Sequence, residues 1–283
     1  MRCIVFCLAV AALFTGGCSR APQRANEVVA VPAQKLALDP GDRAWQQAPE
    51  YAVKLLPQDL VEPRLMRPST AEVLVRSLTN GTEIAFRLEW ADTAPDNLPG
   101  PGRFLDGCAI QLPAKIDSEL PDPQMGQSGK RVEITFWRAD WQASVNGRPD
   151  DIHSLYPNAA IDHYPFEAKS LEPGSDAQKE MAKRYAPATA LGNRRVGPRK
   201  TPVEDMIAEG PGTLSPAPRA ISRGKGVYGK PGWSVVMIRP LPEGFTAKVR
   251  TNIALAIWEG SREEAGARKM RSGWVALAIR EAK

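Results

Sequence analysis

Hydrophobic and polar residues alternate along several short stretches of the chain, a pattern typical of strands that bury one face. Residues 71–78 and 83–90 alternate in this way on either side of Thr79-Asn80-Gly81-Thr82. Asn-Gly favours the two positive φ angles of a type I′ turn, so these stretches predict a β-hairpin. Further strands are predicted at 131–138 (with 141–145 as a candidate extension), 233–240, 251–258 and 273–279.

Residues 146–225 lack this alternation and are rich in proline, glycine, asparagine and charge. Two short helices are predicted there. One covers 175–185, and the other covers 201–207, where Thr201 can cap the first turn and Pro202 suits the first helical position. A segment of this length is typical of a functional covering or an interface. We therefore predict a mainly β fold, an antiparallel β-sandwich with a few short helices in a long irregular insertion.

The N-terminus has the pattern of an export signal, with Arg2 followed by the apolar run 4–14 and then by small residues. The sequence Leu13-Phe14-Thr15-Gly16-Gly17-Cys18 resembles a bacterial lipobox, which implies cleavage before Cys18 and a lipid on its thiol. Cleavage by an ordinary signal peptidase is the alternative.

This N-terminus predicts the organisation of the rest of the chain. We expect a signal peptide at 1–17, a lipid-anchored tether at 18–37 and one folded domain at 38–283. The expected location is the periplasm, at a membrane surface reached through the lipid on Cys18. No later apolar run reaches the roughly 20 residues that a membrane-spanning helix needs.

Composition excludes several classes of function. The 37 Lys and Arg residues against 32 Asp and Glu are scattered and accompany no recognition motif, so no nucleic-acid partner is expected. Two histidines limit any chemistry that needs several imidazoles. Cys108 is the only cysteine after Cys18, and CxxCH and paired CxxC motifs are absent. The sequence thus argues against an intrachain disulfide, covalently attached haem, a zinc site and a cysteine-ligated iron–sulfur cluster. Cys108 is expected to be a small buried residue on a strand.

The common catalytic constellations are missing, since the chain has no GxSxG motif, no P-loop and no GxGxxG motif that follows a predicted strand. His153 and His163 each lie near an aspartate in the irregular segment, where ten residues of loop impose no geometry. The carboxylate pairs Asp150-Asp151 and Glu263-Glu264 are expected to be solvated loop charges.

Two loop residues are stronger candidates for a site. Met125 lies in a loop punctuated by proline and glycine directly before a strand, where a core methionine would be unusual. Lys269 lies near the end of the connection between the last two predicted strands. The alternatives are a methionine folded onto the edge of the sandwich and an ordinary exposed lysine.

An ordered set of motifs extends over most of the chain. The motifs are Asp39-Pro40-Gly41-Asp42-Arg43-Ala44-Trp45, Val75-Arg76-Ser77-Leu78-Thr79-Asn80-Gly81, Arg87-Leu88-Glu89-Trp90-Ala91-Asp92, Met125-Gly126, Val203-Glu204-Asp205 with Ala208-Glu209-Gly210, Gly224-Lys225-Gly226-Val227-Tyr228, and Trp258-Glu259-Gly260-Ser261 through Arg268-Lys269. Together they resemble the haem b (γ) subunits of type II enzymes of the dimethyl-sulfoxide-reductase family. These include the γ subunits of ethylbenzene dehydrogenase, dimethylsulfide dehydrogenase, selenate reductase and chlorate reductase. The similarity spans residues 38–279.

The resemblance implies a β-sandwich that holds one non-covalent haem b with a methionine and a lysine as axial ligands. The family's methionine precedes a glycine ahead of a strand, which matches Met125. Its lysine follows the Trp-x-Gly-Ser strand end, which matches Lys269. Met270 and Lys225 are rival candidates that do not occupy the matching places.

The implied chemistry is consistent. A thioether is a soft ligand that favours ferrous iron. A lysine amine binds iron only when neutral, and holding it neutral near pH 7 costs about 4–5 kcal/mol from an unperturbed pKa of about 10.4. Two strong axial ligands leave no open site for a substrate, so such a haem passes single electrons.

The resemblance therefore implies an electron-transfer subunit with no turnover of its own. Its expected partners are a molybdopterin catalytic subunit, an iron–sulfur subunit and a soluble or membrane electron carrier. The alternative from another class is an extracytoplasmic carbohydrate-binding β-sandwich without haem, in which Trp90, Trp137 and Trp141 would stack on sugars.

Overall fold

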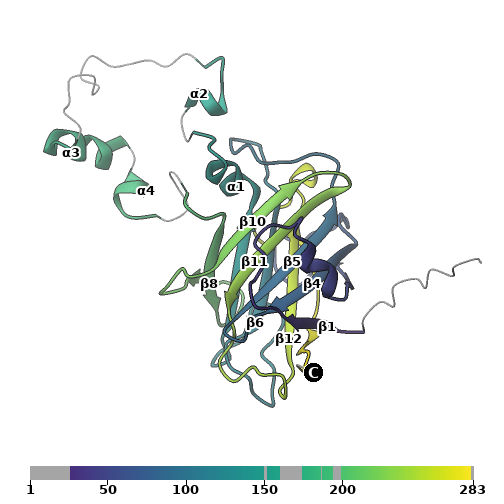
Figure 1. Cartoon of the computed structure of the whole chain (residues 1–283). Coiled ribbons are helices and arrows are strands. Elements are labelled where there is room, and N and C mark those ends of the chain that lie inside the picture. The colour runs from purple at the N-terminus through teal and green to yellow at the C-terminus, as the bar shows by residue number, and fades with distance from the viewer. Residues whose placement is uncertain (1–25, 150–151, 160–173, 186, 194–198, 282–283) are drawn as a thin grey trace, which may run out of the picture.

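The computed structural model describes residues 26–149, 152–159, 174–185, 187–193 and 199–281, which form two packed β-sheets and a few short helices (Figure 1). The strands are β1 (Val28–Pro32), β2 (Tyr51–Lys54), β3 (Leu56–Pro57), β4 (Glu72–Thr79), β5 (Glu83–Ala91), β6 (Gly107–Pro113), β7 (Val132–Arg138), β8 (Val203–Ala208), β9 (Ser215–Pro216), β10 (Arg223–Tyr228), β11 (Gly232–Pro240), β12 (Thr251–Trp258), β13 (Met270–Arg271) and β14 (Val275–Ile279). The helices are η1 (Arg43–Gln47), α1 (Ala139–Val145), α2 (Ile152–Leu155), α3 (Asp176–Tyr185), α4 (Pro187–Ala190) and η2 (Gly260–Arg262). The predicted mainly β fold is confirmed.

Strand order follows β10-β11-β5-β4-β1-β14-β12-β6-β7-β8-β9. We call the part from β10 to β14, with β2, sheet A, and the part from β6 to β9, with β3 and β13, sheet B. Strand β12 belongs to both, because residues 251–253 pair with β14 and residues 254–258 pair with β6. Neighbouring strands are antiparallel except at β1, which runs parallel to both β4 and β14.

Apolar side chains form three layers across the two sheets. The largest cluster lies between the sheets and takes residues such as Phe86 and Val235 from sheet A and Ile110 and Ile257 from sheet B. A second cluster covers the outer face of sheet A, where Trp45 and the chain around it pack on β4 and β11. The third lies on the outer face of sheet B. Sheet B is therefore apolar on both faces.

The predicted hairpin is confirmed, with β4 and β5 paired from Leu74–Glu89 to Thr79–Ile84. The predicted type I′ turn is wrong. Gly81 has a positive φ of 90° but Asn80 does not. The Asn80 side chain instead accepts hydrogen bonds from the backbone amides of Thr82 and Glu83 at 3.0 and 2.7 Å, so it stabilises a wider turn of three residues.

Two other local predictions are wrong. The helix expected at 201–207 is strand β8, which pairs with β7 along its whole length. The strand extension expected at 141–145 is helix α1. The helix predicted at 175–185 is confirmed as α3. Figure 1 shows α2, α3 and α4 outside the two-sheet body, and no helix in the described ranges is long and apolar enough to cross a membrane.

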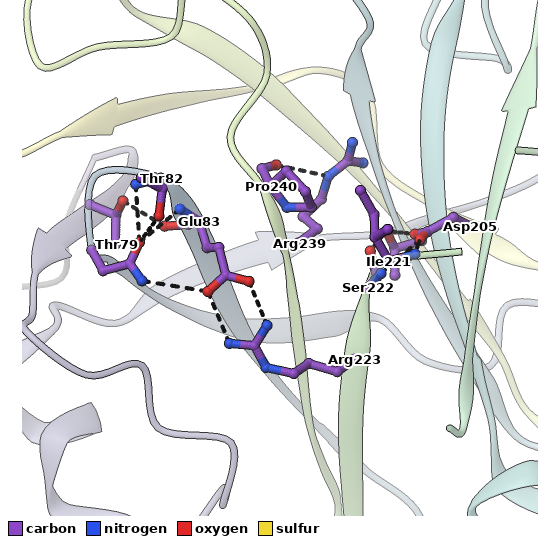
Figure 2. Close-up of polar contacts among 11 residues, drawn as sticks. Thr79, Thr82, Glu83, Asp205, Ile221, Ser222, Arg223, Arg239 and Pro240 are labelled. Carbon is purple, nitrogen blue, oxygen red and sulfur yellow. Dashed lines mark hydrogen bonds and ion pairs between the residues drawn. The ribbon is translucent and has the colours of Figure 1, made fainter. Parts of the chain in front are cut away.

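The end of the irregular segment is fixed to both sheets. Figure 2 shows Arg223, at the start of β10, facing the carboxylate of Glu83 in sheet A, with the closest contacts at 2.5 and 3.0 Å. Asp205 of β8 accepts hydrogen bonds from the backbone amides of Ile221 and Ser222 at 2.9 and 2.8 Å. The insertion expected at 146–225 thus ends in strands of the sandwich itself.

The predicted tether at 18–37 extends too far. Residues 28–32 form β1, whose Val28, Ala30 and Val31 are buried between β4 and β14. The folded domain therefore begins before residue 38. The predicted signal peptide and the lipid site at Cys18 lie outside the described residues.

A chain that begins at residue 34 should be much less stable than one that begins at residue 26. It loses two buried valines and the strand between β4 and β14, which corresponds to about 3–6 kcal/mol of apolar burial. Urea unfolding of the two chains measures the difference. Equal midpoints would mean that β1 contributes nothing to the fold.

Candidate functional site

The outer face of sheet B is a continuous apolar surface. It is formed by alternate residues of neighbouring strands, whose other face packs into the core between the sheets. The residues are Ala109 of β6, Val132, Ile134 and Phe136 of β7, Met206 and Ala208 of β8, and Ala256 and Trp258 of β12. Phe136 and Trp258 contact edge to face, with ring centroids 5.1 Å apart. An apolar sheet face of this kind needs a cover other than water.

A cavity of about 510 Å³ lies against this surface. Its walls come from five loops, at 58–61, 103–105, 123–125, 211–214 and 264–269. A cavity of roughly 300–1,000 Å³ lined mainly by apolar and aromatic side chains is typical of a small-molecule or cofactor site. This cavity is therefore the candidate functional site.

Met125 reaches the cavity from a loop held at several points. Its backbone has a positive φ of 74°, which is unfavourable for a residue with a side chain. The Gly210 amide donates to the Met125 carbonyl at 2.8 Å, and the Gln111 side chain of β6 donates to the Pro123 carbonyl at 3.0 Å. A strained conformation maintained by such contacts is common at functional sites.

Gly126 makes the sharp bend after Met125 possible. Its φ is 79°, and a Cβ atom there would lie 2.7 Å from the Lys130 carbonyl oxygen and 3.1 Å from that of Ala208. Its amide also donates to the Asp122 carbonyl at 2.8 Å. Glycine is the one residue that fits this position without moving the backbone.

Lys269 lines the cavity from the other candidate loop. Its backbone carbonyl accepts a hydrogen bond from the backbone N–H of Gln58 at 2.9 Å, and the side-chain amide of Gln58 donates to the Ala267 carbonyl at 3.1 Å. The Trp258 indole donates to the Gly266 carbonyl at 3.0 Å. The Lys269 Nζ lies 5.0 Å from the centre of the Trp258 ring. The loop before β13 is therefore fixed by hydrogen bonds to Gln58 and to Trp258, whose ring lines the cavity.

Burial, together with the smaller effect of the positive charge of Arg271, lowers the pKa of Lys269 to about 8. Removing the proton at pH 7 then costs about 1.4 kcal/mol, since one pKa unit corresponds to about 1.4 kcal/mol. This is far less than for a solvated lysine. The cavity therefore makes Lys269 available as a neutral nitrogen donor.

The rival candidates lie elsewhere. Met270 is buried in the core between the two sheets. Lys225 lies on β10, where its Nζ pairs with Asp39 at 2.5 Å. Of the four candidate side chains, Met125 and Lys269 are the pair that lines one cavity.

The remaining sequence candidates have structural roles or lie outside the described residues. Cys108 is fully buried on β6, as predicted, and burial raises the pKa of its thiol. His153 is exposed on α2. His163 and Asp150-Asp151 fall outside the described ranges. Glu264 was expected to be solvated and is buried against the cavity, where it accepts a hydrogen bond from the Glu259 amide at 3.0 Å.

The tryptophans proposed as sugar platforms are core residues. Trp90, Trp137 and Trp141 are at most 3% exposed. The Trp90 and Trp137 rings pack edge to face with centroids 6.3 Å apart. Flat, accessible ring faces are absent at these three positions, so the carbohydrate-binding alternative loses the residues on which it rested.

Sequence reasoning missed the aromatic floor of the cavity, Phe136 and Trp258. The signal lay in residues 107–113 and 251–258, which are apolar at nearly every position rather than at every second one. Such runs are typical of strands buried on both faces. Read in this way, they predict that the outer face of sheet B is covered.

A family model described as ethylbenzene dehydrogenase matches residues 42–270. The chain belongs to the ethylbenzene dehydrogenase family. The match covers β2 to the start of β13 and includes both Met125 and Lys269. The resemblance drawn from the sequence motifs is thereby confirmed.

Two relatives match nearly the whole chain. One is named putative respiratory nitrate reductase heme subunit ORF7, from Haloferax mediterranei, and is 24% identical over 280 residues, or 96% of this chain and 79% of that protein. The other is the chlorate reductase subunit gamma of Ideonella dechloratans, 25% identical over 278 residues, or 93% of this chain and 90% of that protein.

Among solved structures, a family 9 carbohydrate-binding module from Caldicellulosiruptor kristjanssonii in complex with cellotriose aligns with a TM-score of 0.42 and 8% identity. The alignment covers 90% of this chain and 94% of that one. A likeness at this level carries no argument about function.

Gly126→Ala should destabilise the protein more than Gly129→Ala does. Both glycines have positive φ, but a Cβ at Gly129 meets nothing within 4 Å. Gly129→Ala should cost about 1 kcal/mol for the backbone conformation alone, and Gly126→Ala about 2–4 kcal/mol because the backbone must also move. Urea unfolding measures both, and equal losses would show that the close approach at Gly126 is unimportant.

Lys269→Met should stabilise the protein when the cavity is empty. The folded state lowers the pKa of this lysine from its model value of 10.5 to about 8, so the unfolded state binds the proton more strongly. The resulting penalty is fully present below pH 8 and disappears as the pH rises towards 10.5. The substitution should therefore add about 2–3 kcal/mol to the free energy of unfolding at pH 7 and less than about 1 kcal/mol near pH 10.5. Lys225→Met, at the lysine paired with Asp39, should give no gain at either pH. A gain of equal size at both pH values would contradict the lowered pKa of Lys269.

Proposed function

We propose that this chain is the electron-transfer subunit of a molybdenum oxidoreductase complex, and that its cavity holds one non-covalent haem b with Met125 and Lys269 as axial ligands. Membership of the ethylbenzene dehydrogenase family supports the proposal, as do relatives named as a nitrate reductase heme subunit and a chlorate reductase gamma subunit. The observation that carries it is that Met125 and Lys269 line the same apolar cavity.

The donor set fits a haem iron. Met125 offers a soft thioether, and Lys269 offers an amine whose pKa of about 8 is already close to neutral pH. The apolar floor formed by Phe136, Ala256 and Trp258 suits the face of a porphyrin and excludes water.

Basic residues around the cavity suit the two haem propionates. Arg103 and Arg271 both line the cavity. The Nη2 of Arg271 lies 3.5 Å from the Asp59 carboxylate, but its Nε is buried without a hydrogen-bond partner, which leaves a donor for a propionate. Arg138 also lines the cavity, but its guanidinium is already paired with Asp140 at 2.5 and 2.6 Å. We therefore propose Arg103 and Arg271 as the propionate partners.

Haem bound through two strong protein ligands supplies one-electron transfer. The residues of this chain would hold the group, reduce the cost of deprotonating Lys269 and exclude water from the apolar floor of the cavity. We propose no catalytic residue for this chain and expect no turnover of substrate by the chain alone.

We also propose a cellular location and binding partners for the chain. Its partners would be a molybdopterin catalytic subunit and an iron–sulfur subunit, with a soluble or membrane carrier as the other electron-transfer partner. The signal peptide at 1–17 and a lipid on Cys18 would place it in the periplasm at a membrane surface. The lipobox motif, rather than the fold, supports this location.

The spectrum of the haem-loaded protein tests the proposed ligands. We expect a six-coordinate, low-spin haem b in the wild type, and loss of that low-spin spectrum in both Met125→Ala and Lys269→Ala, because alanine offers the iron no donor atom. Below about pH 5 the wild type should also lose its lysine ligand, because protonation competes with the iron for the same nitrogen. Visible absorption of oxidised and dithionite-reduced protein measures each state.

Met270→Leu and Lys225→Met are the matched controls, because they alter the rival methionine and lysine outside the cavity. Both should keep the wild-type spectrum. A low-spin spectrum that survives in Met125→Ala and Lys269→Ala, or one that is lost in the two controls, would contradict the assigned ligands.

A further inference from the structure

A second group of buried side chains lies outside the proposed haem cavity. Asp92 directly follows β5, Asp106 directly precedes β6 and Glu259 directly follows β12. They are 6%, 0% and 7% exposed, and each offers a carboxylate oxygen within 4.8 Å of the others. Three carboxylates gathered at this depth need a source of positive charge or of protons.

Basic side chains do not supply that charge. No lysine or arginine of the described residues forms an ion pair with Asp92, Asp106 or Glu259.

The hydrogen bonds to Asp106 favour an ionised carboxylate. Its Oδ2 accepts from the Asp96 amide at 2.7 Å and from the Trp233 indole at 2.9 Å, and its Oδ1 accepts from the Gly260 amide at 2.9 Å. Three N–H donors aimed at one carboxyl group stabilise its charged form and fix its orientation. A cation that lies against Asp106 would therefore meet a carboxyl group already held in place.

Asp92 carries an independent sign of a missing partner. Its Oδ1 accepts a hydrogen bond from the Ala94 amide at 3.0 Å. Its Oδ2 is buried and has no hydrogen-bond partner. An orphaned, buried carboxylate oxygen is costly unless something positive lies against it.

We propose that Asp92, Asp106 and Glu259 bind one calcium ion. All three offer hard oxygen donors and none offers nitrogen or sulfur, which suits Ca²⁺ or Mg²⁺ better than zinc or copper. One oxygen of each lies within 4.8 Å of the others, so a single cation can contact all three. Three protein carboxylates exceed the one or two that usually bind Mg²⁺, which favours calcium. A surface hollow lined by both Asp92 and Glu259 gives the ion a route from solvent.

The ion would connect three segments that shape the neighbouring cavity. Asp106 follows Phe104 and Leu105, which line that cavity. Glu259 begins the connection that ends at Lys269, and the Gly260 amide is bonded to Asp106. Calcium would therefore hold together the end of β5, the start of β6 and the loop that carries Lys269. Calcium binding itself does not depend on haem.

Titration calorimetry and thermal unfolding of the haem-free, metal-free full chain test the proposal. Addition of CaCl₂ should show one bound ion per chain and raise the unfolding midpoint, and EGTA should reverse the rise. Asp92→Asn and Glu259→Gln keep the side-chain shapes and should each weaken binding more than about tenfold, since each removes one of three negative ligands. Glu243→Gln, at an exposed glutamate, should leave binding unchanged.

Several results would overturn the proposal. One is the absence of calcium binding and of any midpoint shift in the wild type at millimolar CaCl₂. Another is unchanged binding in Asp92→Asn and Glu259→Gln, which would place the ion elsewhere. Tighter binding of MgCl₂ than of CaCl₂ would contradict the choice of ion. Because every measurement is made without haem, none of these outcomes depends on the proposed function.

Discussion

Both faces of sheet B are apolar, but sheet A covers one of them. Its inner face packs on sheet A around residues such as Ile110 and Ile257. Its outer face, with Phe136 and Trp258, is bordered by loops that leave a cavity of about 510 Å³. Exposing that floor to water is unfavourable, and a flat apolar group bound there removes the penalty. The apolar outer face of sheet B thus favours the binding of an apolar group, and the side chains of the bordering loops determine which group fits.

The loops place two side chains with metal-binding atoms in the cavity, and each placement reduces the stability of the fold in a different way. Met125 is brought to the cavity by an unfavourable backbone conformation, which several hydrogen bonds and Gly126 maintain. Burying Lys269 in the cavity destabilises its charged form, which lowers its pKa to about 8. Both are local losses of stability that a metal–ligand bond can offset. Stability and function therefore oppose each other at these two residues, as they commonly do in functional sites.

Much of this architecture could be predicted from the sequence, because alternation fixes strands well. The hairpin of β4 and β5 and the strands β7, β11 and β12 follow from local pattern. Thr201 and Pro202 resemble the start of a helix, and the helix predicted from them is wrong. Pairing with β7 and burial of Val203 and Met206 make this segment a strand, because these tertiary contacts outweigh the local helix preference.

The site was only partly predictable. Met125 and Lys269 were found through family motifs, and no local pattern could show that they share a cavity. The buried group of Asp92, Asp106 and Glu259 was missed, because its members end or begin three strands that are distant in sequence. Glu264 was misjudged for a related reason, since a charged loop residue gives no sign of burial until the loop is folded against β12.

An experimental structure of the haem-loaded protein tests the central claim most directly. The account predicts iron bonded on one side to the Met125 sulfur and on the other to the Lys269 Nζ, with the porphyrin lying over Phe136 and Trp258. Haem bound elsewhere on the chain, or iron held by other side chains, would contradict it.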